Sequence, residues 1–145
     1  MVSSKEVGTR WFHEVWKRRN LDAIEELMAP GALGHLEGGQ EIAGPKEFRE
    51  FFEAIVSALP DIQVEVLKVI AEGEHVSVLW SAKAVHSGDG LGLKATGRPV
   101  AFRGITWLHV VSGKIVEGWD CWNQGGLIGA LTLPEPENPA LYVGD

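Results

Sequence analysis

The chain has 145 residues and a formal net charge of −7 at pH 7, with 45% of its residues hydrophobic and 23% charged. These values are ordinary for one globular domain with a sizeable core, and they exclude disordered and collagen-like chains. The acidic balance argues against a nucleic-acid-binding protein, which needs a clustered basic face to neutralise phosphates.

The sequence lacks several features, and their absence limits the compartment and the cofactors that we expect. It has no run of about 18 apolar residues, and its first residues, MVSSKEVG, contain no apolar segment of the signal-peptide kind. Its one cysteine, Cys121, has no partner for an internal disulfide, and the five histidines show no paired metal-ligand spacing. No glycine-rich nucleotide motif is present. We therefore expect a cytoplasmic protein with no membrane association, no metal and no cofactor.

The N-terminal residues predict a helix. Ser3 followed by Glu6 forms a capping-box pattern, which is typical of a helix start. Apolar residues then follow at four-residue spacing, as on one face of a helix. They are Val7, Trp11 and Val15. We expect this helix to run from about residue 4 to 19.

Two further helices are expected before the middle of the chain. Asn20 is suited to cap a short helix that Pro30-Gly31 stops. Pro45 suits the first turn of a third helix, which Pro60 closes. The glycine-rich passage between these helices, residues 31–44, is predicted to be loop with a short strand or two.

After the third helix the hydrophobic period changes to that of a strand. Alternating apolar residues predict four long strands. They are residues 62–73, 75–86, 99–111 and 114–123. Three helices followed by four strands indicate an α+β fold, in which a curved, antiparallel-rich sheet wraps around the helices. We expect one domain over residues 1–133 and a proline-rich acidic tail, residues 134–145, along the surface.

The pairing of the last two strands decides whether Asp120 faces solvent or the interior, because a shift of one residue turns every side chain to the opposite face. A two-residue turn at Ser112-Gly113 would set Asp120 opposite Ile105. A three-residue turn that includes Val111 would set it opposite Gly104. We favour the second register, because Asn-Gly rather than Ser-Gly is typical of a two-residue type I′ turn.

The favoured register gives these strands two different faces. On one face an acid, a hydroxyl and two glycines lie among apolar walls, which describes a ligand pocket. The predicted pocket residues are Asp120, Thr106, Phe102, Leu108, Trp122 and Trp80. The opposite face is amphipathic and suited to a homodimer contact. Its large apolar members are Ile105, Trp107, Ile115 and Trp119.

A series of short segments follows one another in a recognisable order along the chain. They are Gly44-Pro45 through Phe52, ALPD at 58–61, AVHSG around His86, Gly97, SGKIVEGWD and the closing GGLIGAL. In order and spacing these segments resemble the SnoaL-like polyketide cyclase family of the NTF2-like superfamily. The resemblance covers about residues 5 to 132, and it implies a cone of curved sheet closed by three helices.

The resemblance also implies a function. In the polyketide cyclases an aspartate on the last strand acts as general acid and base in an intramolecular aldol closure, and Asp120 stands at that place. Two histidines that help shape the cyclase site are replaced here by Gly118 and Thr106. We therefore predict a cofactor-free cyclase, isomerase or lyase that acts on a small, largely apolar cyclic or polyketide-like molecule. Asp120 would transfer the proton, and burial would raise its pKa toward neutrality.

Other functions of the same fold are weighed against this one. A non-catalytic binding module is the alternative, because the replaced histidines leave the acid without a second polar group. An epoxide-hydrolase-like enzyme is more remote, since those relatives need Arg-x-Asp on the third strand, where this chain has Arg103-Gly104-Ile105. Ketosteroid-isomerase-like and scytalone-dehydratase-like sites need buried tyrosines, and the only tyrosine is Tyr142 in the tail.

Two histidines are further candidates for the pocket. His35 lies in the glycine-rich passage, where the family often brings a polar side chain over the mouth of the cone; the alternative is an exposed loop residue. His86 ends the second strand, where it either contacts the substrate or anchors a turn through its side chain.

Overall fold

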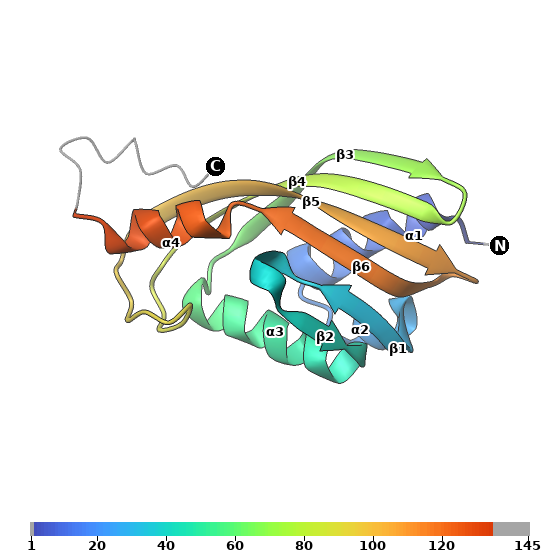
Figure 1. The fold of residues 1–145 in the computed structure, drawn as a ribbon, viewed down its shortest axis with the longest axis horizontal. Coiled ribbons are helices and arrows are strands. Elements are labelled where there is room, and N and C mark those ends of the chain that lie inside the picture. The colour runs from blue at the N-terminus through green and yellow to red at the C-terminus, as the bar shows by residue number, and fades with distance from the viewer. Residues whose placement is uncertain (1, 135–145) are drawn as a thin grey trace.

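A strongly curved sheet of six strands forms one side of the molecule, and the N-terminal helices pack against its concave face (Figure 1). The computed structural model describes residues 2–134, so the predicted tail beyond Pro134, including Tyr142, lies outside the described residues. The strands are β1 Met28–His35, β2 Glu41–Ala43, β3 Gln63–Glu72, β4 His75–Val85, β5 Pro99–Val111 and β6 Lys114–Trp122. Their order across the sheet is β2-β1-β6-β5-β4-β3. This arrangement confirms the predicted α+β cone.

Helical segments fill the concave side and close one end. They are α1 Ser4–Arg10, η1 Trp11–Lys17, α2 Asp22–Leu27, η2 Glu37–Gly39, α3 Gly44–Ala58 and α4 Gln124–Thr132. The capping box is confirmed, because the Ser3 hydroxyl accepts a hydrogen bond from the Glu6 backbone nitrogen at 3.1 Å. The first helix widens into a π-helix at η1, and this wider turn buries Trp11, Phe12 and Val15. None of the helices within residues 2–134 is long and apolar enough to cross a membrane.

The second helix is shorter than predicted. It ends at Leu27, and no side chain caps its start, so Asn20 does not have the predicted capping role. Met28 already belongs to β1, which pairs in parallel with β6, and the pairing brings Gly34 opposite Gly118. The third helix begins and ends as predicted, with Pro45 in its first turn.

The turn between β5 and β6 differs from the favoured prediction. Ser112 and Gly113 have φ angles of 51° and 78°, and Val111 pairs with Lys114, so the turn has two residues in the left-handed region, as a type I′ turn requires. A β-bulge follows in β6, because Val110 pairs with Ile115 whereas His109 pairs with Glu117.

These two departures, each of one residue, add up to a shift of two and therefore preserve the direction of Asp120. It lies opposite Thr106 instead of Gly104 and faces the concave side as predicted. Ile115 precedes the bulge and is turned the other way from its predicted face. It is 2% exposed and packs in the core, so its predicted place on the outer surface is wrong.

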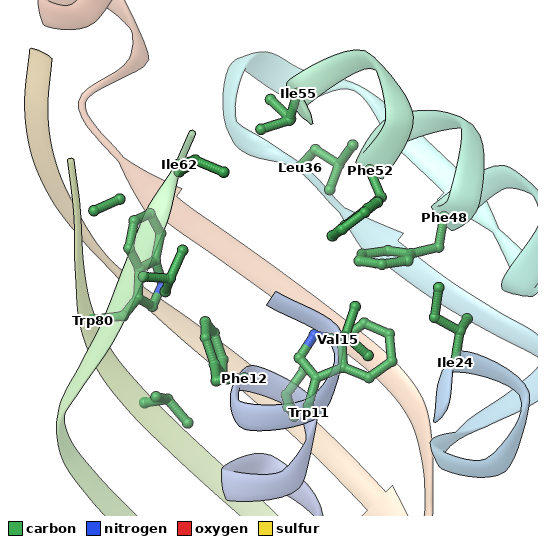
Figure 2. Close-up of a cluster of buried hydrophobic side chains, with 14 of the residues drawn as sticks. Trp11, Phe12, Val15, Ile24, Leu36, Phe48, Phe52, Ile55, Ile62 and Trp80 are labelled. Atoms are coloured by element: carbon green, nitrogen blue, oxygen red, sulfur yellow. The ribbon is translucent and has the colours of Figure 1, made fainter. Parts of the chain in front are cut away.

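The core lies between the helices and the concave face. Figure 2 shows Phe48 and Phe52 of α3 lying toward Trp11 and Phe12 of η1, with Trp80 on β4 facing this group. The rings of Trp11 and Phe48 are 4.7 Å apart, and those of Phe12 and Trp80 are 6.4 Å apart. Aromatic side chains of this size contribute much of the apolar area that stabilises a small domain.

Candidate active site

A cavity of about 90 Å³ lies between the helices and the concave face of the sheet, partly open to solvent. Its walls come from η1, α3, β1 and the four long strands, and they are almost entirely aromatic and aliphatic. Apart from the tryptophan indoles, the lining residues with polar side chains are His35, Thr106 and Asp120. The predicted pocket residues Phe102, Leu108, Trp122 and Trp80 also line it.

A chain of hydrogen bonds across β4, β5 and β6 leads to the acid. Trp80 Nε1 donates to Thr106 Oγ1 at 3.0 Å, inside the core. The Thr106 hydroxyl then donates to Asp120 Oδ1 at 2.7 Å. The indole donor fixes the direction in which the hydroxyl proton points, and the hydroxyl fixes one carboxylate oxygen. The other oxygen of Asp120 makes no hydrogen bond with the described residues and is available to a ligand.

Gly104 makes this arrangement possible. A Cβ atom at this position would lie 2.6 Å from Trp80 Cζ2 and 2.7 Å from Trp122 Cβ, both closer than carbon atoms approach each other. The absence of a side chain therefore lets the Trp80 indole lie across β5 and reach Thr106. Phe102 completes the wall, with its ring 5.1 Å from that of Trp122.

The surroundings of Asp120 raise its pKa from 3.8 to about 6. Burial of the carboxylate is the main cause, because apolar walls penalise the charged form. The Thr106 hydrogen bond acts in the opposite direction, and the negative charge of Glu37 adds a smaller increase. The residue keeps some exposure because it lines an open cavity. An acid with this pKa is mostly ionised at neutral pH and is easily protonated, which suits proton transfer in both directions.

Glu37 is a functional candidate that the sequence analysis missed. It lies in η2, at the end of β6, where its Oε2 accepts a hydrogen bond from the Trp122 backbone nitrogen at 3.1 Å. This position depends on the parallel pairing of β1 with β6, which the alternation of the strands does not reveal. The sequence signal that remains is an acid followed by two glycines, and both Gly38 and Gly39 adopt positive φ.

His35 lines the cavity as predicted, but its imidazole ring is engaged elsewhere. Nε2 lies 2.7 Å from Glu117 Oε2, and Nδ1 lies 3.2 Å from Glu41 Oε1. The ring also stacks on Trp119, with 5.4 Å between centroids. Glu117 and Trp119 alternate with Gly118 and Asp120 along β6, so the ring is bound to the outer face of the sheet.

His86 is fully buried and is not among the residues that line the cavity. Its Nδ1 accepts a hydrogen bond from the Thr96 backbone nitrogen at 3.2 Å and lies 3.0 Å from Thr96 Oγ1. Within the described residues its Nε2 has no hydrogen-bond partner. The side chain thus ties residue 86 to residue 96 across the loop that joins β4 to β5.

The outer face of the sheet keeps most of the predicted apolar residues. Ile105 and Trp107 are each 46% exposed, and Trp119, opposite Trp107, is half-buried.

No group of three or more potential metal ligands occurs among the described residues.

Comparisons with known proteins agree with this architecture. The family described as SnoaL-like polyketide cyclase matches residues 6–131 of the chain. No curated protein sequence shows significant similarity. A candidate SnoaL-like polyketide cyclase from Jannaschia sp. CCS1 is 23% identical with a TM-score of 0.85, over 90% of this chain and 92% of that one.

Two other solved structures show the same fold. A candidate hydroxylase from Streptomyces galilaeus is 29% identical with a TM-score of 0.78, over 90% of this chain and 97% of that one. An NTF2-like protein of unknown function from Burkholderia pseudomallei is 17% identical with a TM-score of 0.75, over 91% of this chain and the whole of that one.

Proposed function

Because the chain belongs to the SnoaL-like polyketide cyclase family, we propose that it is an enzyme that uses Asp120 as general acid and base on a small, largely apolar carbonyl compound. One observation carries this proposal: a carboxylate with a pKa of about 6 lines an apolar cavity, with one oxygen held by Thr106 and the other without a hydrogen bond to the described residues. The reaction class is cyclisation, isomerisation or elimination, none of which requires a redox step.

In a cyclisation, the ionised Asp120 removes a proton from a carbon next to a carbonyl group and leaves an enolate. The enolate carbon attacks a second carbonyl of the same molecule, so that one carbon–carbon bond forms and an alkoxide develops. The protonated Asp120 then returns the proton to this alkoxide, and no atoms are gained or lost. The Thr106 hydroxyl holds the acid in place throughout, since Trp80 fixes its orientation.

The size of the cavity narrows the substrate class. Its volume of about 90 Å³ is below the ~150 Å³ of an apolar cavity that binds benzene. The enclosed space is therefore too small for several fused rings, and a substrate with one ring would extend into the part of the cavity that is open to solvent.

Proton exchange tests the proposal without knowledge of the substrate. Cyclohexanone and other one-ring monoketones, whose uncatalysed exchange is slow at neutral pH, are incubated with the protein in D₂O, and deuterium incorporation next to the carbonyl is followed by NMR. We expect Asp120→Asn to lower the exchange rate by about 10²–10⁴, the usual contribution of one general acid or base. Glu72→Gln, a change of equal charge on an exposed residue of β3, is the matched control. An Asp120→Asn variant as active as the unaltered protein would falsify the assignment.

A non-catalytic ligand-binding role is the second candidate. It is favoured by the positions of Gly118 and Thr106, where the polyketide cyclases carry histidines. A protein that binds one-ring ketones in this cavity but leaves their protons in place in D₂O supports this role over the enzymatic one.

We also propose that the protein forms a homodimer through the outer face of the sheet. Exposed Ile105 and Trp107 and half-buried Trp119 form a continuous apolar surface on β5 and β6. Light scattering at micromolar concentration is expected to give twice the mass of the chain, and Trp107→Glu is expected to give a monomer. A monomeric mass for the unaltered protein would rule out this interface.

A further inference from the structure

We propose that the cavity binds small hydrophobic cations, with a protonated amine paired to the Asp120 carboxylate. The proposal concerns the cavity of the proposed function and rests on its assignment of Asp120 as an ionisable group that faces the ligand. It requires no catalysis, and it goes beyond the carbonyl substrates considered above.

The acid of the cavity has no basic partner among the described residues. Of the described residues, those that line the cavity include no lysine or arginine. The imidazole of His35 is engaged by Glu41 and Glu117. Asp120 is held by a neutral hydroxyl, that of Thr106. An ionised carboxylate in apolar surroundings is costly unless a cation pairs with it, so a ligand that brings the cation gains that interaction.

The electrostatic potential around Asp120 is negative. Glu37 sits at the end of β6, bound to the Trp122 backbone nitrogen, and its charge reaches Asp120, as its effect on the pKa of that acid indicates. Two carboxylates whose charges interact repel anionic ligands and attract cationic ones. The chain as a whole adds to this preference with its net charge of −7.

The walls of the cavity are suited to an organic cation. Trp80, Phe102 and Trp122 lie in one contiguous group, with ring centroids 6.0 Å apart for Trp80 and Phe102 and 5.1 Å apart for Phe102 and Trp122. The faces of such rings are electron-rich and attract organic cations within about 6 Å. Aromatic rings and one buried acid together form a complementary site for an ammonium group on a short apolar body.

Binding is expected to depend on the ionisation of Asp120. The other titratable groups near it are Glu37 on η2 and His35 on β1, whose imidazole is held by Glu117 on the outer face. With a pKa of about 6, roughly one tenth of Asp120 is ionised at pH 5 and nearly all at pH 7.5. Amine affinity should therefore fall about tenfold between pH 7.5 and pH 5.

Three probes of equal size and different charge test this selectivity. They are benzylamine, benzyl alcohol and benzoate, whose dissociation constants are measured by calorimetry or by ligand-observed NMR. At pH 7.5 we expect benzylamine to bind about tenfold more tightly than benzyl alcohol, and benzoate to bind most weakly. Asp120→Asn is expected to remove the preference for the amine, whereas Glu72→Gln, with the same change in net charge, keeps it.

Equal affinity of the unaltered protein for benzylamine and benzyl alcohol would overturn the proposal, and so would an Asp120→Asn variant that still prefers the amine. If that variant fails to fold, the comparison of pH 5 with pH 7.5 on the unaltered protein decides the question. A protein that selects the amine but exchanges no protons in D₂O would overturn the proposed enzyme and leave the cation site. The reverse result would overturn the cation site alone.

Discussion

Glu117 and Asp120 are carboxylates three residues apart on the same strand, and they lie in opposite electrostatic surroundings. Glu117 is on the outer face of β6, where the imidazole of His35 lies 2.7 Å away. Asp120 is on the concave face, where it meets a hydroxyl and aromatic rings. Strand alternation thus places a partnered acid and an unpartnered one on opposite faces of the sheet, and the neighbours determine which of the two is suited to proton transfer.

The largest effect on stability is expected from Asp120→Asn. The folded-state pKa of Asp120 is raised to about 6, so between about pH 4 and pH 6 the folded protein binds more protons than the unfolded one. The stability that this group contributes is therefore fully present below about pH 4 and is lost as the pH rises through 6. At pH 7.5 the variant, which carries no charge there, should be more stable than the unaltered protein by up to about 3 kcal/mol.

Urea denaturation at pH 4 and pH 7.5 measures this difference. Most of the gain should disappear at the lower pH, because Asp120 is then neutral in the folded protein and only about half ionised in the unfolded one. A variant that is less stable at pH 7.5 would mean that the carboxylate is better solvated, or better paired, than its apolar surroundings indicate.

A somewhat smaller effect on stability is expected from Gly104→Ala, which adds a methyl group against Trp80 and Trp122 in the cavity wall. The added Cβ would lie 2.6 Å from the Trp80 ring and 2.9 Å from the Cys121 carbonyl oxygen, so the indole must move away from Thr106. Overpacking of this kind lowers the free energy of unfolding by about 1–3 kcal/mol. Gly129→Ala in α4 is the control, since its Cβ would meet nothing within 4 Å. Equal stabilities of the two variants in a thermal melt would contradict this account of Gly104.

The smallest effect is expected from Glu117→Gln on the outer face. The Glu117 hydrogen bond is the main cause that raises the pKa of His35. Removal of that charge should lower the pKa of His35, as followed by NMR titration of the ring protons, and should leave proton exchange at Asp120 unchanged. A change in catalysis of the size expected for Asp120→Asn would show that the two faces are coupled.

Much of the fold follows from periodicity in the sequence. Three features lie where predicted: the capping box at Ser3, the proline at the start of α3 and the alternation of the four long strands. The direction of Asp120 also agrees, but through two local departures that offset each other. Hydrophobic alternation shows which face of the sheet a residue lies on, and a shift of two residues in the pairing leaves that face unchanged. The pattern therefore predicts the face of Asp120 but not its partner on β5.

The parts of the site that escaped prediction depend on long-range pairing. Glu37 reaches the end of β6 because β1 pairs with that strand in parallel, and the glycine-rich passage that precedes Glu37 carries little alternation. Ile115 was assigned to the outer face because a bulge of one residue leaves no mark in an apolar run such as KIVEGW. Both features are properties of the assembled sheet and not of any one segment.

The bulge in β6 changes which residues of the strand face the interior. Before it the odd-numbered Ile115 points inward, and after it the even-numbered Gly118 and Asp120 do. Deletion of Val116 would remove the bulge, so that a single alternation of faces would run along β6. Either Ile115 would come to the surface, or Glu117 would enter the apolar interior while Asp120 left it. The one extra residue at the bulge thus keeps the apolar side chain of Ile115 and the carboxylate of Asp120 on the same side of the strand. We expect an insertion or deletion at this point to abolish the site before it abolishes the fold.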